Sequence, residues 1–179
     1  LQRKPIETPA KNIILFVGDG MGISTVTAAR IYDGQLRGET GEENSLAFEQ
    51  LPYVALSKTY ETNQQVADSA GTMTAMLTGV KTKSGIIGLN QNVARGDCRS
   101  GAGKTVETLL EQAEKLGRST GVVTTARLTH ATPAATYAHA ADRDWESDRD
   151  MPESERSAGC KDIARQLIEF HVGNGLEIA

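Results

Sequence analysis

Aromatic residues are scarce in this chain, and long apolar runs are absent from it. Phe, Trp and Tyr together make up 4% of the 179 residues, whereas hydrophobic residues make up 39%. The core must therefore be built mainly from Ala, Val, Ile and Leu, which suits packed helices and parallel strands. The longest apolar run, Ile13 to Val17, is far shorter than the roughly 20 residues that cross a bilayer. We expect no transmembrane segment.

Blocks of one charge are also absent. The net charge of −4 arises from 19 basic and 23 acidic residues that are interspersed along the chain. Nucleic acids and anionic membranes attract clustered Lys and Arg, so this pattern argues against a nucleic-acid-binding surface and a polybasic membrane patch. A small-molecule partner is the better expectation.

Only two cysteines and three histidines are present. Cys98 and Cys160 each lie in a polar stretch, whereas a free structural cysteine usually has apolar neighbours. Their spacing alone leaves a disulfide and two free thiols equally open. The chain starts at Leu1 without an initiating Met or an apolar signal core, which we interpret as a processed or trimmed N-terminus.

Patterns typical of strands alternate with patterns typical of helices. A polar lead-in over residues 1–11 precedes residues 12–179, which we interpret as one α/β domain. The expected strands cover 12–17, 53–59, 119–125 and the start of one at 176–179; the expected helices cover 23–32, 69–77, 105–116 with Thr105 as its cap, and 160–172. Because the chain stops inside an expected strand, we expect it to be incomplete.

Asp19 lies among glycines directly after the first expected strand. The run from Gly18 to Gly22 lacks the third glycine of a dinucleotide fingerprint, which would fall at Ile23. A carboxylate held by glycines at the C-terminal edge of a sheet is suited to a hard cation. The alternative is a glycine-rich turn in which Asp19 caps the next helix.

Three further positions could carry chemistry. Ser69 lies at the start of an expected helix, in a run close to the G-x-S-x-G elbow, although a serine there is more often an N-cap. His130 and Thr132 are two residues apart, so an extended backbone would point both side chains the same way, as in a metal site or an ordinary turn. Arg143, between Asp142 and Asp144, is a surface charge by default.

Together these runs resemble the alkaline phosphatase family, and its animal and marine-bacterial branch more closely than its enterobacterial one. The resemblance extends from about Asn12 to the C-terminus. Its motifs are Val17-Gly-Asp-Gly-Met-Gly22, Asp68-Ser-Ala-Gly-Thr72, Gly121-Val-Val-Thr-Thr125, His130-Ala-Thr-Pro-Ala134, Tyr137-Ala-His139, Arg143-Asp-Trp145 and Gly159-Cys160.

The resemblance implies a metal centre of two zinc ions and one magnesium ion. Asp19 would bridge one zinc and the magnesium, and Ser69 would be the nucleophile whose oxygen binds that zinc. Thr132 would ligate the magnesium directly, and His130 would reach it through a water molecule.

The resemblance also implies a phosphate site and a disulfide. Arg143 would grip two oxygens of the substrate phosphate or of inorganic phosphate, with Asp68 positioning its guanidinium. Cys98 and Cys160 match a disulfide pair of the animal members, which implies a periplasmic or secreted protein. The enzyme would be a homodimer.

Members of the family are more than twice as long, and the remaining zinc ligands lie in the part that has no counterpart here. Zinc usually takes four ligands, so neither zinc site can be complete in this chain. The resemblance implies half of a three-layer α/β/α sandwich around a mostly parallel sheet, from an enzyme that hydrolyses phosphate monoesters through a phosphoserine at Ser69. We expect these 179 residues alone to be inactive. The alternatives are a Ser-His-Asp esterase and a non-catalytic half chain that requires its partner.

Overall fold

The computed structural model describes residues 8–179, and the chain divides into two units between Ser57 and Lys58. Each unit is described by itself. In the first unit, helix α1 (Ile23–Leu36) follows Gly22, and a short 3-10 helix, η1, covers Ala47–Gln50. The helix expected at 23–32 is therefore confirmed, and it continues one turn further. After α1 the chain folds back along the helix. Asn44 holds it there, because its Nδ2 donates to the Arg30 carbonyl at 2.8 Å.

The expected buried strand at residues 12–17 is neither paired nor buried. Its backbone has no ladder partner among the described residues, and Phe16 is 90% exposed. An extended segment becomes a buried strand only where neighbouring strands take up its hydrogen bonds and cover its faces. The prediction of a buried strand at this position was wrong for the chain as it stands.

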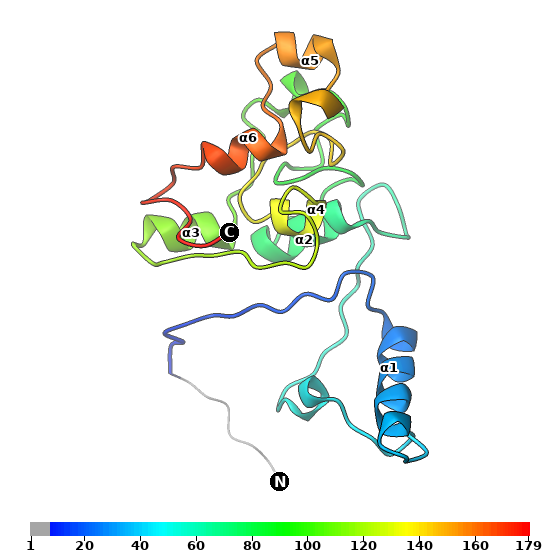
Figure 1. Ribbon diagram of the computed structural model, residues 1–179. Coiled ribbons are helices and arrows are strands. Elements are labelled where there is room, and N and C mark those ends of the chain that lie inside the picture. The colour runs from blue at the N-terminus through cyan, green and yellow to red at the C-terminus, as the bar shows by residue number, and fades with distance from the viewer. Residues whose placement is uncertain (1–7) are drawn as a thin grey trace. The chain divides into compact units, whose positions relative to one another are not determined.

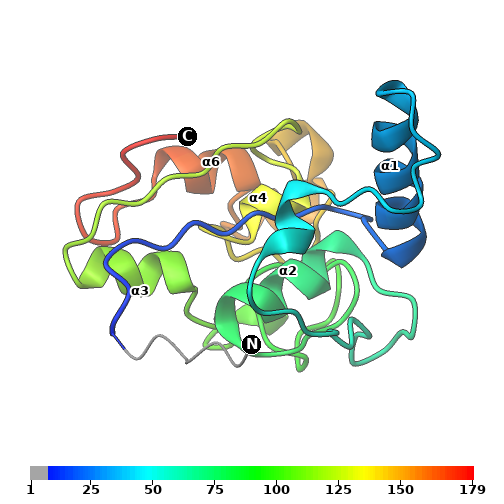
Figure 2. The same ribbon diagram turned by 90° about the horizontal axis from the view of Figure 1, so that it is seen from below.

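The second unit contains five α-helices around a small-residue core. Helix α2 covers Ser69–Thr78, α3 covers Leu109–Lys115, α4 covers Ala131–Ala134, α5 covers Glu153–Ser157 and α6 covers Ile163–Ile168, with 3-10 turns η2 at Arg99–Gly101 and η3 at Asp148–Asp150. Helices α2 and α4 pack side by side (Figures 1 and 2). Both helices bury alanines completely, including Ala70 of α2 and Ala134 of α4, and side chains this small allow backbones to approach closely.

The expected sheet is represented only by isolated bridges between residues 8 and 179. One of them joins Gly121 to Ile178 in parallel, within the segments expected to form the strands 119–125 and 176–179. The Val122 N–H donates to the Ile178 carbonyl at 2.9 Å in the same pairing. Val54 is 97% exposed and Val123 is 90% exposed, so these two apolar side chains of the expected strands are not covered, whereas Val122 is buried. The α/β/α sandwich is thus not formed by the described residues alone.

Helix α3 begins later than the sequence pattern predicts. Its N-cap is Thr108, whose Oγ1 accepts the Glu111 N–H at 3.1 Å while a Glu111 carboxylate oxygen accepts the Thr108 N–H at 2.7 Å. This reciprocal capping box satisfies two N–H groups that the helix leaves unpaired. Thr105 forms an antiparallel bridge to Leu89 instead, so its assignment as the cap was wrong.

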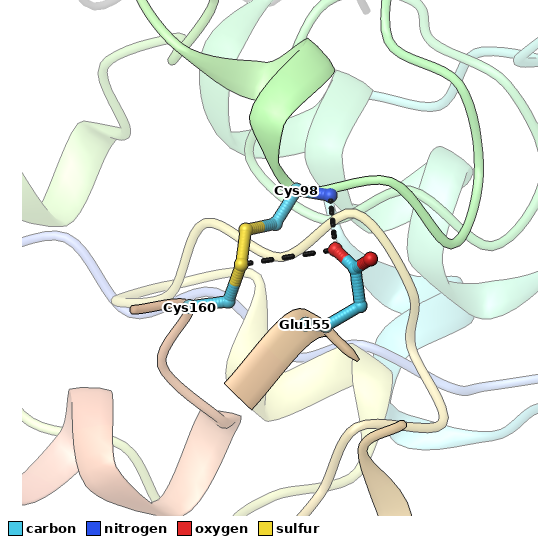
Figure 3. A group of neighbouring side chains, drawn as sticks. All are labelled: Cys98, Glu155 and Cys160. Atoms are coloured by element: carbon cyan, nitrogen blue, oxygen red, sulfur yellow. Dashed lines mark hydrogen bonds between the residues drawn. A yellow bond between two sulfur atoms is a disulfide. The ribbon is translucent and has the colours of Figure 1, made fainter. Parts of the chain in front are cut away.

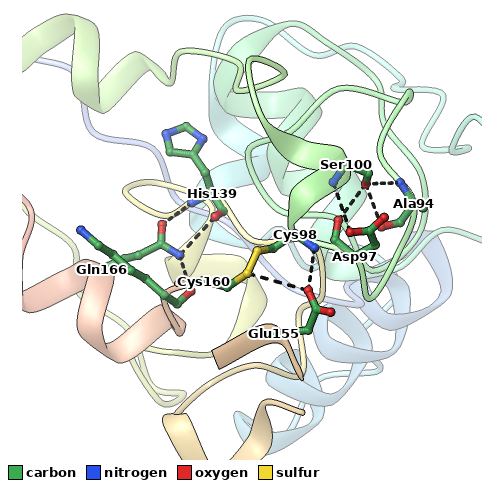
Figure 4. The surroundings of a disulfide bond; sticks show 9 residues. Ala94, Asp97, Cys98, Ser100, His139, Glu155, Cys160 and Gln166 are labelled. Atoms are coloured by element: carbon green, nitrogen blue, oxygen red, sulfur yellow. Dashed lines mark hydrogen bonds between the residues drawn. A yellow bond between two sulfur atoms is a disulfide. The ribbon is translucent and has the colours of Figure 1, made fainter. Parts of the chain in front are cut away.

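A disulfide joins Cys98 to Cys160 across 62 residues, as the family resemblance implies. Figure 3 shows Glu155 beside it, with its Oε2 accepting the Cys98 N–H at 3.1 Å. The bond packs against a buried apolar cluster that includes Trp145 and Met151. Nearby, Gln166 makes hydrogen bonds to the backbone of His139 (Figure 4). No helix among residues 8–179 is long and apolar enough to cross a membrane.

Candidate active site

The carboxylate of Asp68 connects three parts of the second unit. Its Oδ1 accepts the Gly71 N–H at 2.9 Å and so caps helix α2. Its Oδ2 accepts the Gly85 N–H at 3.0 Å and a hydrogen bond from Arg143 Nη1 at 3.1 Å. Both carboxylate oxygens are therefore committed, and they hold the helix start, the loop at Gly85 and the arginine together.

Ser69 is the first residue of α2, directly after this cap. The helix begins where the sequence predicts, but the capping group is Asp68 rather than Ser69. The interpretation of Ser69 as an ordinary N-cap serine is therefore not supported. At this position the hydroxyl lies at the positive end of the ten-residue helix, where a negatively charged group is stabilised.

Arg143 is an anchored residue and not a surface charge. Its N–H donates to the Gly85 carbonyl at 2.8 Å, and its side chain is only 22% exposed. While Nη1 contacts Asp68, Nη2 lies 3.2 Å from His130 Nε2. The guanidinium is thus held on two sides, by Asp68 at the start of α2 and by His130 at the start of α4.

His130 and Thr132 lie at the beginning of α4, where His130 is the N-cap residue. Helix α4 packs against α2, and Arg143 contacts both His130 and Asp68, which is adjacent in sequence to Ser69. Asp19 lies in the first unit, in the turn that precedes α1. Its role at this site stays a prediction.

Sequence reasoning missed Glu61, which lies beneath the start of α2. Its side chain is buried, and its Oε1 accepts the Asp68 N–H at 3.0 Å. Burial, and next the side chain of Asp68, raise the pKa of Glu61 to about 7, although the hydrogen bond from the Asp68 N–H acts in the opposite direction. Burial also raises the pKa of Asp68, but hydrogen bonds with Glu61, Gly71 and Arg143 outweigh it and leave that pKa below its usual value. A single acid in a polar stretch gave no sequence signal of this role.

His139 forms a second polar pair, away from Arg143. Its Nδ1 lies 2.7 Å from the Gly88 carbonyl and its Nε2 lies 2.9 Å from Glu111 Oε1. Since a carbonyl and a carboxylate only accept, both ring nitrogens donate, and the imidazole is cationic. His139 is therefore committed to an ion pair, and His130 Nε2 is committed to Arg143. This arrangement does not match a Ser-His-Asp triad, in which Nε2 must accept the serine proton.

The residues predicted to bind metal offer mainly oxygen. Asp19, Ser69 and Thr132 contribute a carboxylate and two hydroxyls, which fit a hard cation such as Mg²⁺. The imidazole of His130 is the one nitrogen donor among the predicted ligands, whereas zinc is usually held by four ligands rich in nitrogen or sulfur.

A different group of side chains could in principle hold a metal ion. Within residues 8–179, one such group brings three potential ligand atoms close together, at Cys98, Glu155 and Cys160. Both of its sulfur atoms belong to the disulfide (Figure 3), so this group does not form a metal site.

Comparison with known proteins gives a consistent picture. A family profile described as alkaline phosphatase matches residues 10–174. The chain is 57% identical over 160 residues to an alkaline phosphatase of Gadus morhua, covering 89% of this chain and 34% of that protein. It is 56% identical over 159 residues to the human tissue-nonspecific isozyme, covering 89% of this chain and 30% of that one. The chain thus spans about a third of the length of these relatives.

Solved structures give similar matches. A cold-active alkaline phosphatase from a psychrophilic Shewanella sp. superposes with a TM-score of 0.60 at 34% identity, covering 71% of this chain and 29% of that chain. The alkaline phosphatase of Thermus thermophilus superposes with a TM-score of 0.57 at 28% identity, covering 80% of this chain and 25% of that one. Both matches support a shared fold over most of the described residues.

Proposed function

Because this chain belongs to the alkaline phosphatase family, we propose that the whole enzyme carrying it hydrolyses phosphate monoesters with Ser69 as the nucleophile. The observation that carries the proposal is the Asp68 carboxylate, which holds Arg143 beside the helix that Ser69 begins. One partly buried carboxylate thereby fixes both the backbone beside the nucleophile and the arginine that would bind the phosphate.

Each residue then has a role that its position supports. The planar guanidinium of Arg143 can donate two parallel hydrogen bonds to phosphate oxygens, and Asp68 limits its rotation. Ser69 Oγ attacks phosphorus while the alcohol leaves, and water then attacks the phosphoserine to release inorganic phosphate. The positive end of α2 favours the anionic phosphate in both steps.

The proposed reaction also involves metal ions, which residues of this chain would help to bind. Asp19 and Thr132 would bind magnesium, with His130 acting through water, and Asp19 and Ser69 would also bind one of two zinc ions. The zinc sites would be completed by residues outside this chain. When bound, such metals lower the pKa of a serine hydroxyl or a water molecule, which makes either a better nucleophile.

We further propose that residues 12–179 are the N-terminal part of one domain, after a lead-in over residues 1–11, with a three-layer α/β/α sandwich in the whole enzyme. The parallel bridge from Gly121 to Ile178 supports a parallel sheet, and exposed Val54 and Val123 are suited to burial in it. The 179 residues alone would be inactive. Turnover of p-nitrophenyl phosphate by the purified chain would contradict this.

The disulfide between Cys98 and Cys160 supports a periplasmic or secreted location, because disulfides persist in oxidising compartments. The whole enzyme would be a homodimer that binds phosphate monoesters and inorganic phosphate.

The assignment of the nucleophile is tested by trapping the phosphoenzyme. In the whole enzyme, Ser69→Ala should abolish the covalent phosphate that acid quenching traps, because the hydroxyl that would form the ester is gone. Thr72→Ala, one turn further along the same helix, is the matched control and should still be phosphorylated. Phosphate recovered on a residue other than Ser69 would refute the assignment.

A further inference from the structure

Glu61 is a buried acid whose backbone is held by hydrogen bonds of its own, in addition to the contact that its side chain makes with α2. Its N–H donates to the Gln64 carbonyl at 2.9 Å, and the next N–H, of Thr62, donates to the Thr82 carbonyl at 3.0 Å. Asn63 accepts the Ser84 N–H at 2.9 Å. These contacts hold the segment against residues 82–84, and the Glu61 side chain is only 4% exposed.

The Glu61 carboxylate fits closely under the first turn of α2. Its Oε1 accepts the Asp68 N–H, which belongs to the peptide just before the helix. A Cβ at Gly71 would collide with the same carboxylate, so the carboxylate can occupy this place because Gly71 has no side chain. The other oxygen, Oε2, is buried and receives no hydrogen bond from a protein donor among residues 8–179. A buried acceptor without a donor lowers the free energy of unfolding, so its presence calls for an explanation other than stability.

We propose that Glu61 is a positioning residue for the phosphate site, acting through Asp68; this inference rests on the proposed function. Glu61 fixes the Asp68 peptide, and Asp68 in turn holds both Arg143 and the first turn of α2. A shift of the Asp68 peptide therefore moves the arginine and the nucleophile together. Nothing in this contact requires Glu61 to touch the phosphate itself.

The test compares three variants of the whole enzyme by their inhibition constant for inorganic phosphate. Glu61→Ala removes the acceptor of the Asp68 N–H and should raise this constant about 10-fold or more, since small displacements at a binding site have large effects. Glu61→Gln keeps an acceptor oxygen and adds a donor, and should stay within about threefold of the parent. Should the alanine variant not fold, Glu61→Asp replaces it, because its shorter side chain withdraws from the Asp68 N–H.

Glu114→Ala is the matched control. Glu114 is 1% exposed, accepts hydrogen bonds from Thr120 and Asn174, and lies in α3 away from Asp68. Its loss should lower thermal stability and leave the phosphate inhibition constant unchanged. If Glu61→Ala raised the phosphate inhibition constant no more than Glu114→Ala does, the proposal would be overturned.

A double variant separates this inference from the proposed function. If Glu61 acts through Asp68, then adding Glu61→Ala to Asp68→Ala should raise the inhibition constant little further. Effects that multiply would overturn the positioning role while leaving the phosphatase proposal intact. If Arg143→Ala alone leaves phosphate inhibition unchanged, the phosphate site itself is wrongly assigned and the role of Glu61 is refuted with it.

Discussion

His139 and Glu111 form a largely buried ion pair, in which Nε2 of the imidazole lies 2.9 Å from Oε1 of the carboxylate. The pair is strengthened from both sides. The Gly88 carbonyl holds Nδ1 of His139, and the Thr108 N–H donates to the second oxygen of Glu111. It thereby ties the capping box of α3 to the segment that follows α4.

The ion pair predicts a pH window for stability. Burial lowers the pKa of His139, but Glu111 and Gly88 outweigh it and raise this pKa above 6.5; burial raises the pKa of Glu111, but His139 and Thr108 bring it below 4.5. The histidine's contribution is complete below 6.5 and is lost as pH rises through its folded pKa. The contribution of Glu111 is complete above 4.5 and is lost as pH falls through its folded pKa.

His139→Gln should therefore lower the melting temperature more at about pH 5.5 than at about pH 9. Exposed His171, changed to Gln in the same way, is the control and should show no such difference. Equal losses for His139→Gln at the two pH values would show that the imidazole is not charged in the folded chain.

Removing Arg143 should weaken phosphate binding in the whole enzyme more than metal binding. A charge-assisted hydrogen bond contributes about 1.5–3 kcal/mol, so Arg143→Ala should raise the inhibition constant for inorganic phosphate about 10- to 100-fold. The metal content, measured by atomic emission, should stay the same. Arg127→Ala removes an exposed arginine paired with Glu146, and phosphate inhibition should not respond to it.

Adding one methyl group at Gly71 should destabilise the start of α2. The new Cβ would collide with the buried Glu61 carboxylate, and overpacking of this kind costs about 1–3 kcal/mol. Gly101→Ala is the comparison, because the buried Cβ there would first meet a Leu89 methyl group at 3.3 Å, which can move. Chemical denaturation should show a clear loss for the first variant and a small one for the second.

Thr108 and Thr105 give a direct comparison of the observed and the predicted cap of α3. Thr108→Ala removes the side chain that accepts the Glu111 N–H and should cost about 1 kcal/mol of unfolding free energy. Thr105→Ala, at the exposed position that the sequence pattern favoured, should change stability by less than about 0.5 kcal/mol. Equal losses would argue against the capping box.

Breaking the disulfide should lower stability without altering the phosphate site. A bond that closes a loop of 62 residues restricts the unfolded chain, and losing it typically costs about 2–4 kcal/mol. Cys98→Ser with Cys160→Ser should therefore melt at a lower temperature, while phosphate inhibition of the whole enzyme stays constant. A changed inhibition constant would show that the bond supports the site as well as the fold.

The start of α2 could be predicted from sequence because its signals are local. A run of small residues after Ser69 predicts the helix within a few positions, and the structure has it there; the cap is Asp68, one residue before the serine that the sequence pattern favours as a cap. The cap of α3 was misplaced because two threonines precede that helix. Only the Thr108 to Glu111 spacing completes a capping box.

Non-local features could not be predicted in the same way. The apolar run at residues 12–17 has the composition of a buried strand, but burial depends on segments elsewhere that must pair with it. Glu61 gave no signal because its role comes from contacts seven to ten residues away, at Asp68 and Gly71. The sequence motifs placed Arg143 at a phosphate site only through family resemblance, since its neighbours Asp142 and Asp144 suggest a solvated charge.

The carboxylate of Asp68, whose two oxygens both accept hydrogen bonds, also affects the entropy of phosphate binding. A free arginine side chain loses up to about 2 kcal/mol of rotamer freedom when it is immobilised. Because Asp68 and His130 already restrain the guanidinium of Arg143, most of that freedom is lost when the chain folds and not when an anion arrives. The arginine is preorganised, so more of its interaction energy remains for affinity.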